Sequence, residues 1–175
     1  TRNHSSAASD VYKRQGRLIY VSSISAMGIF DEGDCIYKTE SDFSSETDNY
    51  GRSKRAAEVW LENYADEKNA DIVILRPGVI YGPNMQCWLA DLVEDVKHGR
   101  LGRLAHGAQA IPLVHIENLV EIFLTILASK ERLGLRTYIC VDEGSPSLDD
   151  VITHIAGLYG VCLLYTSPSP RDIGE

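Results

Sequence analysis

The segment Arg17-Leu18-Ile19-Tyr20-Val21-Ser22 is a short and nearly continuous apolar run. Such a run is typical of a parallel strand that is buried on both faces. A second run, Asp71-Ile72-Val73-Ile74-Leu75, has the same character and is stopped by Arg76-Pro77-Gly78. Two strands of this kind, far apart in the chain, predict a largely parallel sheet whose strands are connected through helices.

The segments around these runs carry helical patterns. Asn49–Ala65 is predicted to be a helix, and its apolar side is assigned to Ala56, Ala57, Val59, Trp60 and Tyr64. Further helices are expected at Trp88–Lys97, at Ile116–Ala128 and from an N-cap at Ser147 to near Gly157, with a third strand at Arg136–Val141. Strands that alternate with helices indicate an α/β layered fold.

The two ends of the chain differ from its middle. Residues 1–15 and 162–175 lack the apolar runs and charged helix faces of residues 16–161. A DNA sequence that encodes Asp10–Gln15 gives Cys162–Ser167 when its reverse complement is read one base out of frame. Both ends therefore resemble translations of a sequencing-library adapter. We predict that residues 16–161 are the native domain and the flanks are not, with a pair of disordered tails as the alternative.

Charge and cysteine content argue against several classes of function. The chain has 17 Lys and Arg against 25 Asp and Glu, a net charge of −8, and it stays acidic without the flanks. This balance argues against nucleic acid or an anionic membrane as the main partner. No apolar run approaches the roughly 20 residues of a membrane span. Cys35, Cys87 and Cys140 lack metal-ligand spacing, which predicts reduced thiols, no metal site and a cytoplasmic protein.

Tyr50 and Lys54 are four residues apart in a predicted helix, so their side chains lie on one face. A neighbouring ammonium favours the phenolate form of a tyrosine, which makes such a tyrosine a candidate acid or base toward an alcohol or carbonyl oxygen. Tyr64 and Lys68 have the same spacing, so spacing alone identifies no site. Tyr50, however, follows a strand that ends at Ser22-Ser23, and the carboxyl ends of parallel strands form ligand crevices. Tyr64 lies about 21 Å further along the helix.

Four segments in order carry a family resemblance: Leu18–Ser23, Tyr50–Lys54 followed by Ala57-Glu58, Ile74–Pro83, and Leu113–Leu119. Together they resemble the extended short-chain dehydrogenase/reductase family, which is the NAD-dependent epimerase/dehydratase and 3β-hydroxysteroid dehydrogenase group. The resemblance covers nearly all of residues 16–161. It implies the C-terminal part of a Rossmann-type doubly wound parallel sheet, a small substrate-binding portion, and NAD or NADP as the cofactor.

The resemblance also assigns catalytic roles to three residues. Ser23 would orient the substrate oxygen, and Tyr50 would donate or accept its proton. Lys54 would assist the phenolate and hold the nicotinamide ribose. These assignments are expectations that follow from the family motif.

The cofactor-binding residues that the resemblance implies are Ser22, Tyr50, Lys54, Pro77 and Val79. Backbone at Pro77 and Val79 would line the nicotinamide carboxamide. The family's glycine-rich turn, which binds pyrophosphate at a helix N-terminus, would precede Gly16. The sequence therefore does not distinguish NAD from NADP.

Three positions depart from the pattern of nucleotide-sugar epimerases. Those enzymes usually carry Asn where this chain has Val79, Arg near Ile111, and Tyr where it has Met27. Because burying an anion without partners is costly, apolar residues at these positions predict a less charged substrate. His115 is interpreted as a packed histidine.

Three functions follow as alternatives. The first is an NAD(P)-dependent oxidoreductase that moves hydride between the cofactor and a secondary alcohol or ketone of a small molecule. The second is a nucleotide-sugar epimerase or dehydratase, and the third is a non-catalytic cofactor-sensing or scaffold protein. A homodimer of the full-length protein is left open. The 175 residues alone are expected to be inactive, because the pyrophosphate-binding unit is missing.

Overall fold

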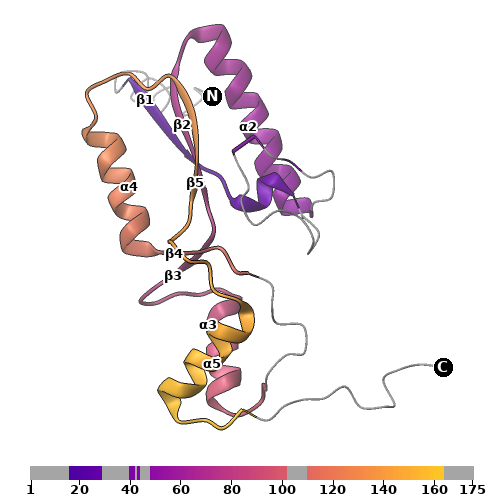
Figure 1. The fold of residues 1–175 in the computed structure, drawn as a ribbon. Coiled ribbons are helices and arrows are strands. Elements are labelled where there is room, and N and C mark those ends of the chain that lie inside the picture. Colours follow the sequence, from indigo (N-terminus) through magenta and orange to yellow (C-terminus); the bar gives the residue numbers. More distant parts are fainter. Residues whose placement is uncertain (1–15, 29–39, 42, 44–47, 102–109, 164–175) are drawn as a thin grey trace, which may run out of the picture. The chain divides into compact units, whose positions relative to one another are not determined.

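The computed structural model describes residues 16–28, 40–41, 43, 48–101 and 110–163. The chain divides into two compact units, whose elements are labelled in Figure 1. Unit 1 comprises Thr1–Gly78 and Asn118–Cys140, and unit 2 comprises Val79–Glu117 and Val141–Glu175.

Unit 1 contains a three-stranded parallel sheet. Its strands are β1 (Arg17–Val21), β2 (Asp71–Pro77) and β5 (Leu135–Cys140), in the order β1-β2-β5. In the central strand β2, Ile72–Leu75 are at most 1% exposed. The predicted α/β fold with a parallel sheet is confirmed, and the strand predictions hold to within two residues at each end.

Strand β1 is less buried than predicted. It pairs with β2 along one edge, and the side chains of Leu18 and Val21 are 37% and 40% exposed. A continuous apolar run predicts burial on both faces, and that prediction is right for β2 and wrong for β1. The difference arises because β1 is an edge strand of the described sheet, whereas β2 has a partner on both sides.

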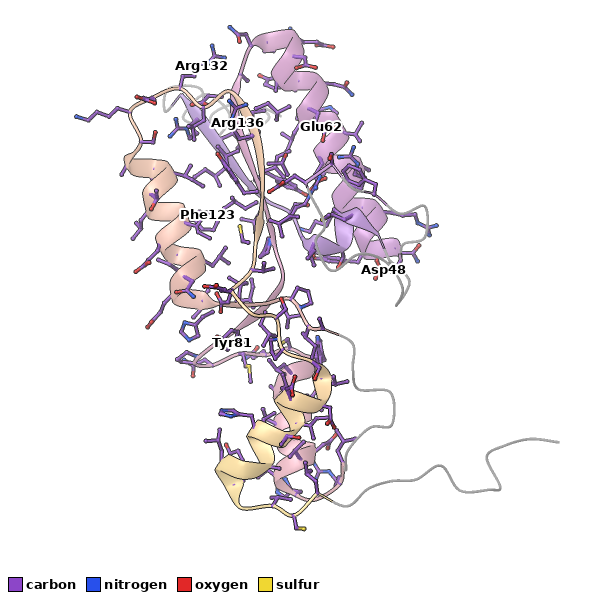
Figure 2. The ribbon with its side chains drawn as sticks, in the orientation of Figure 1. Asp48, Glu62, Tyr81, Phe123, Arg132 and Arg136 are labelled. Atoms are coloured by element: carbon purple, nitrogen blue, oxygen red, sulfur yellow. The ribbon has the colours of Figure 1, made fainter. Side chains whose placement is uncertain are left out.

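Two helices lie on opposite sides of this sheet in Figure 1. Helix α2 spans Asn49–Lys68, and helix α4 spans Ile116–Ala128, entering unit 1 at Asn118. The Asp48 carboxylate caps α2 by accepting a 2.6 Å hydrogen bond from the Gly51 N–H. At the other end the Arg132 guanidinium donates to Asn69, the C-cap residue; Asp48 and Arg132 are labelled in Figure 2.

The apolar side predicted for α2 is correct only in part: Tyr64 packs, partly buried, against the apolar core. The buried residues of α2 are Gly51, Glu58, Leu61 and Ala65. Val59 and Trp60 are exposed, and the Trp60 ring stacks on Tyr64 at 5.4 Å between ring centroids. Glu58 occupies a position on the buried face of α2, so the distribution of apolar residues alone predicts the neighbouring face as the buried one.

Unit 2 combines a short strand pair with two helices. Strands β3 (Val79–Tyr81) and β4 (Leu113–His115) pair in parallel, and neither was predicted. Helices α3 (Trp88–Lys97) and α5 (Leu148–Tyr159) pack through an apolar cluster of Val96, Ile152, Ile155 and Ala156. Leu163, within the flank predicted to be non-native, is partly buried against this cluster. Ser147 and Asp150 form a capping box at the start of α5, which confirms the predicted N-cap.

Among the described residues, no helix is both long and apolar enough to cross a bilayer. In the same part of the chain, no group of His, Cys, Asp and Glu side chains is arranged to hold a metal ion.

Candidate active site at the carboxyl end of the sheet

The structure brings Tyr50 and Lys54 together beside the end of β1. Lys54 Nζ donates a 3.1 Å hydrogen bond to the carbonyl of Val21, the last residue of that strand. It lies 5.7 Å from the centroid of the Tyr50 ring and 5.5 Å from that of Tyr20. The Tyr50 side chain is about half exposed. An ammonium is thus fixed close to a phenol that solvent can reach.

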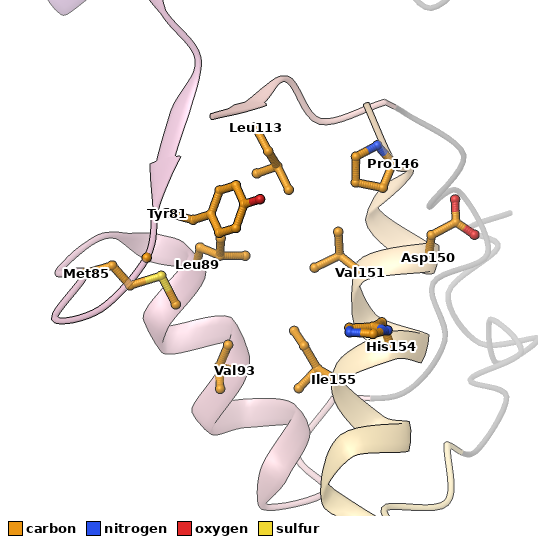
Figure 3. A pocket seen from close by; sticks show the side chains of 11 residues that line it. Tyr81, Met85, Leu89, Val93, Leu113, Pro146, Asp150, Val151, His154 and Ile155 are labelled. Carbon is orange, nitrogen blue, oxygen red and sulfur yellow. The ribbon is translucent and has the colours of Figure 1, made fainter. Parts of the chain in front are cut away.

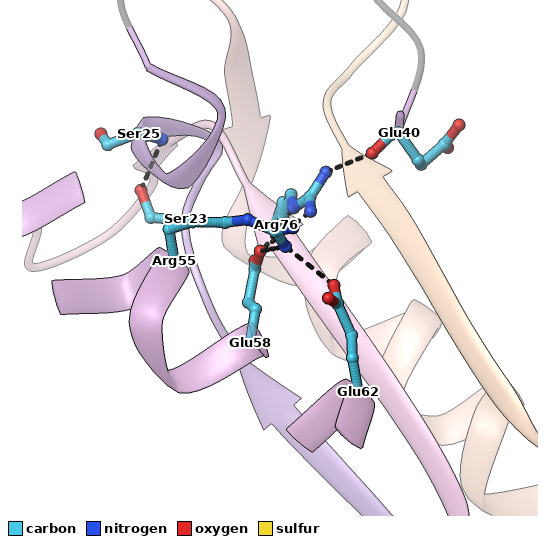
Figure 4. A network of polar contacts seen from close by, with 7 residues as sticks. All are labelled: Ser23, Ser25, Glu40, Arg55, Glu58, Glu62 and Arg76. Carbon is cyan, nitrogen blue, oxygen red and sulfur yellow. Dashed lines mark hydrogen bonds and ion pairs between the residues drawn. The ribbon is translucent and has the colours of Figure 1, made fainter. Parts of the chain in front are cut away.

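Ser23 follows the same strand end. It is the N-cap of a short 3-10 helix, η1 (Ile24–Met27), and its Oγ accepts a 3.2 Å hydrogen bond from the Ser25 N–H (Figure 4). Helix η1 packs against α2, so the segment that carries Ser23 contacts the helix that carries Tyr50. The three predicted catalytic residues all lie in unit 1.

Ser22 points into the interior. Its side chain is 3% exposed, and its Oγ has no partner of normal hydrogen-bond geometry among the described residues. The hydroxyl is nevertheless close enough to the Glu58 carboxylate to contribute to lowering the pKa of Glu58. Its predicted role toward the cofactor stays a prediction.

Pro77 and Val79 fall in different units. Pro77 is the buried last residue of β2 and pairs in register with Cys140. Val79 begins β3, and its N–H donates a 2.7 Å hydrogen bond to the Pro112 carbonyl within unit 2. The predicted contacts of both residues with the carboxamide stay predictions.

A buried ion pair between α2 and β2 was not assigned a role from the sequence. Arg76 Nε and Nη2 each donate a 2.9 Å hydrogen bond to the two carboxylate oxygens of Glu58, and both side chains are at most 1% exposed (Figure 4). Burial alone would raise the pKa of Glu58, but the hydrogen bonds and charge of Arg76 lower it below its ordinary value. The sequence signal for this ion pair is Glu58, a charged residue at a position on the buried face of α2.

Unit 2 contains a mainly apolar pocket of about 620 Å³ between α3 and α5 (Figure 3). Its lining includes Tyr81, Leu89, Leu113, Val151 and Ile155, with Asp150 and His154 as charged or titratable members. The hydroxyl of Tyr81 donates a 3.0 Å hydrogen bond to Asp142; burial and this bond raise the pKa of Tyr81.

His115, Ile111 and Met27 have packing roles in the structure. The His115 ring meets Tyr81 edge-on at 5.0 Å, as expected for a packed histidine. Ile111 is 8% exposed and Met27 1%, so both side chains are part of the core. Packing alone accounts for apolar residues there, which weakens their use as a guide to substrate charge.

The sequence matches the model of the NAD dependent epimerase/dehydratase family over residues 5–139. A parallel sheet with a tyrosine and a lysine at its carboxyl end is an arrangement expected of such enzymes. The chain belongs to this family, so the predicted family and the predicted NAD-type cofactor are confirmed. The match begins within the flank interpreted as adapter, whose boundary stays a prediction.

One similar protein is a UDP-glucose 4-epimerase. The chain is 34% identical to UDP-glucose 4-epimerase of Vibrio cholerae over an alignment of 114 residues, and the match covers 63% of this chain and 34% of that protein. This chain thus spans about a third of that relative's length.

Solved structures show the same fold. MoeE5 in complex with UDP-glucose and NAD superposes with a TM-score of 0.68 at 24% identity, covering 83% of this chain and 48% of that one. UDP-glucuronic acid 4-epimerase from Bacillus cereus in complex with NAD gives 0.73 at 19% identity, covering 84% and 47%. RMD from Pseudomonas aeruginosa complexed with NADPH gives 0.70 at 18% identity, covering 89% and 56%.

Proposed function

We propose that the full-length protein transfers hydride reversibly between NAD(P) and a secondary hydroxyl of a nucleotide sugar, as an epimerase or dehydratase. The observation that carries this proposal is the Lys54 ammonium fixed 5.7 Å from the Tyr50 ring at the end of β1. The substrate class is taken from the 34% identical relative, a UDP-glucose 4-epimerase. The comparisons thus favour the second of the functions predicted from the sequence over the first.

The residues of unit 1 suit a nicotinamide cofactor. An ammonium has three N–H donors, and the Val21 carbonyl accepts one of them from Lys54. The others suit ribose hydroxyls, and the backbone at Pro77 would line the carboxamide. The bound cofactor would supply or accept the hydride. Whether it is NAD or NADP depends on the glycine-rich unit that the resemblance places before Gly16.

The chain's own residues would handle the proton. In the oxidising direction the substrate O–H and C–H bonds break and a carbonyl forms; Tyr50 Oη takes the proton as the hydride leaves. The Lys54 ammonium would hold the cofactor beside Tyr50, and the Ser23 hydroxyl would hold the substrate oxygen. In the reducing direction Tyr50 returns the proton, so one residue serves both half-reactions of an epimerase.

A second candidate is net oxidation of an uncharged alcohol. It is favoured by the apolar lining of the pocket in unit 2, which offers few polar groups for a diphosphate. The two candidates differ in whether the cofactor changes its redox state over a complete turnover.

The test uses the full-length protein with NAD or NADP and UDP-glucose as the probe. We expect NMR to show conversion of the sugar to its 4-epimer without net nicotinamide absorbance change. Net reduction of the cofactor by uncharged secondary alcohols, with no sugar conversion, would establish the second candidate instead. Cofactor binding without turnover of either substrate class would contradict both and support the non-catalytic alternative.

We also propose that the full-length protein is a homodimer with a cytoplasmic location. We further propose that the flanks at residues 1–15 and 162–175 are non-native and that the 175 residues alone are inactive. Sedimentation of the full-length protein tests the homodimer, and resequencing of the genomic locus tests the flanks.

A further inference from the structure

The Glu58–Arg76 pair buries two opposite charges. Glu58 is 0% exposed and Arg76 1%. Removing charges from water is expensive, and a buried ion pair often stabilises a fold no better than apolar residues of similar volume. Stability alone is therefore a weak reason for this pair, and its place in the fold indicates another.

The pair joins the two elements that carry the candidate site. On α2, Glu58 lies about one helical turn after Lys54, and Lys54 lies about one turn after Tyr50. Arg76 is the residue before Pro77 at the carboxyl end of β2. The two hydrogen bonds between Arg76 and Glu58 thus fix the position of helix α2 relative to the carboxyl end of strand β2.

Arg76 has a third connection, to the segment before α2. Its Nη1 donates a 2.7 Å hydrogen bond to the Glu40 carbonyl. The Phe43 ring lies 4.9 Å from the Arg76 guanidinium and 4.1 Å from that of Arg55. Arg55 in turn donates to Glu58 at 3.1 Å and to Glu62 at 2.8 Å (Figure 4). The Arg76 guanidinium, carried by strand β2, therefore contacts both helix α2 and the segment that precedes this helix.

We infer that Arg76, through Glu58, is a positioning residue that sets the location of Tyr50 and Lys54 for proton transfer. The inference rests on the proposed function of Tyr50. A lysine would keep the charge but cannot reproduce the planar donor fork that holds both carboxylate oxygens and the Glu40 carbonyl. The expected effect lies in turnover rather than in substrate binding.

The matched control is the other ion pair of β2. Asp71, at the amino end of the strand, accepts a 2.9 Å hydrogen bond from Arg17 Nε. Asp71→Asn weakens this pair on the same strand, but it lies at the end away from Tyr50.

In the full-length protein, Arg76→Lys should lower kcat for UDP-glucose about tenfold to hundredfold, because small misplacements of catalytic groups are costly. KM should stay within about twofold, since binding groups are untouched. Asp71→Asn should lower Tm while leaving kcat within about twofold. Equal kcat losses in the two variants, or a lower Tm with unchanged kcat in Arg76→Lys, would overturn the inference.

Two further variants keep the test decisive. If Arg76→Lys does not fold, Arg55→Gln removes one of the hydrogen bonds to Glu58 from a partly exposed site and should give a smaller loss of kcat at constant KM; unchanged kcat would overturn the inference. Tyr50→Phe in the same assay separates the two levels. An unchanged kcat in Tyr50→Phe would contradict the proposed function. A lowered kcat in Tyr50→Phe together with an unchanged kcat in Arg76→Lys would contradict only the positioning role of Arg76.

Discussion

Both units of the chain bury apolar side chains, but among the described residues only unit 1 also buries polar and charged ones. Among the described residues, the buried polar or charged ones are Ser22, Glu58 and Arg76, and all belong to unit 1. The buried described residues of unit 2 are apolar: Leu89, Val96, Ile111, Val114, Ile152, Ile155 and Ala156.

This difference separates two ways of holding a structure in place. Apolar packing is non-directional and tolerates substitutions that conserve volume. A buried bidentate ion pair fixes orientation, but leaving one charge without its partner is costly. The buried ion pair thus occurs in the unit that carries the candidate proton-transfer residues, whereas the buried side chains of the unit that carries the apolar pocket rely on shape-based packing.

The largest effect is expected at Tyr50. In the full-length protein, Tyr50→Phe keeps the ring but removes the transferable proton, so kcat should fall roughly 10²–10⁴-fold. Tyr64→Phe, on the same helix with a lysine at the same spacing, should leave kcat nearly unchanged. Steady-state kinetics of both variants checks this, and equal losses would show that the wrong tyrosine–lysine pair was chosen.

Glu58→Gln should destabilise the full-length protein by about 3 kcal/mol at neutral pH, because Arg76 stays buried without a counter-charge. The pKa of Glu58 is lowered in the folded state, so its contribution is complete above the ordinary glutamate range and is lost as pH falls through the lowered value. The difference from the unaltered protein should therefore shrink as the pH falls below the ordinary glutamate range. Urea unfolding across this range measures it, and a constant difference would contradict the assignment.

Gly82→Ala should cost about 2 kcal/mol, because the residue has a positive φ and an added Cβ needs space. Gly82 has φ +142°, and its Cβ would lie 2.7 Å from Cγ2 of Ile116. Gly99 has φ +65° with nothing within 4 Å, so Gly99→Ala is the control that isolates the steric part. Thermal unfolding should show the larger loss for Gly82; a larger loss for Gly99 would contradict the close approach of Gly82 to Ile116.

The smallest effect is expected at Ile152, which is fully buried in the apolar cluster of unit 2. Ile152→Val should cost about 1 kcal/mol, the price of one methylene group and a small void. Since no charge is involved, this loss should be the same at neutral and acidic pH. A pH-dependent loss of stability in Ile152→Val would contradict the expectation that only the Glu58→Gln loss depends on charge.

Most long elements could be predicted from the sequence, because their patterns are local. Helices α3 and α4 begin and end at the predicted residues, and β2 is the buried strand that its apolar run indicates. Strands β3 and β4 are three residues long and carry no pattern of their own. They form only because a distant partner is present.

The candidate site was predictable only in part. The spacing of Tyr50 and Lys54 indicates a shared helix face, and the structure places both beside the end of β1. The Glu58–Arg76 pair depends on a helix meeting a strand, which no single segment encodes. Edge exposure of β1 could not be predicted either, because an apolar run does not specify how many neighbours a strand has.

The contacts of Arg17 bear on the order in which the protein assembles during synthesis. Its guanidinium binds Asp71 and the carbonyls of Ile126, Ser129 and Glu131, and the last of these lies 114 residues further along the chain. At about 5–20 residues per second, a ribosome needs roughly 5–20 s to produce that distance. Strand β1 must therefore leave the ribosome well before its partners exist. The pairing of β1 with β2 needs only residues 71–75, so the sheet can begin to form long before Arg17 completes its contacts.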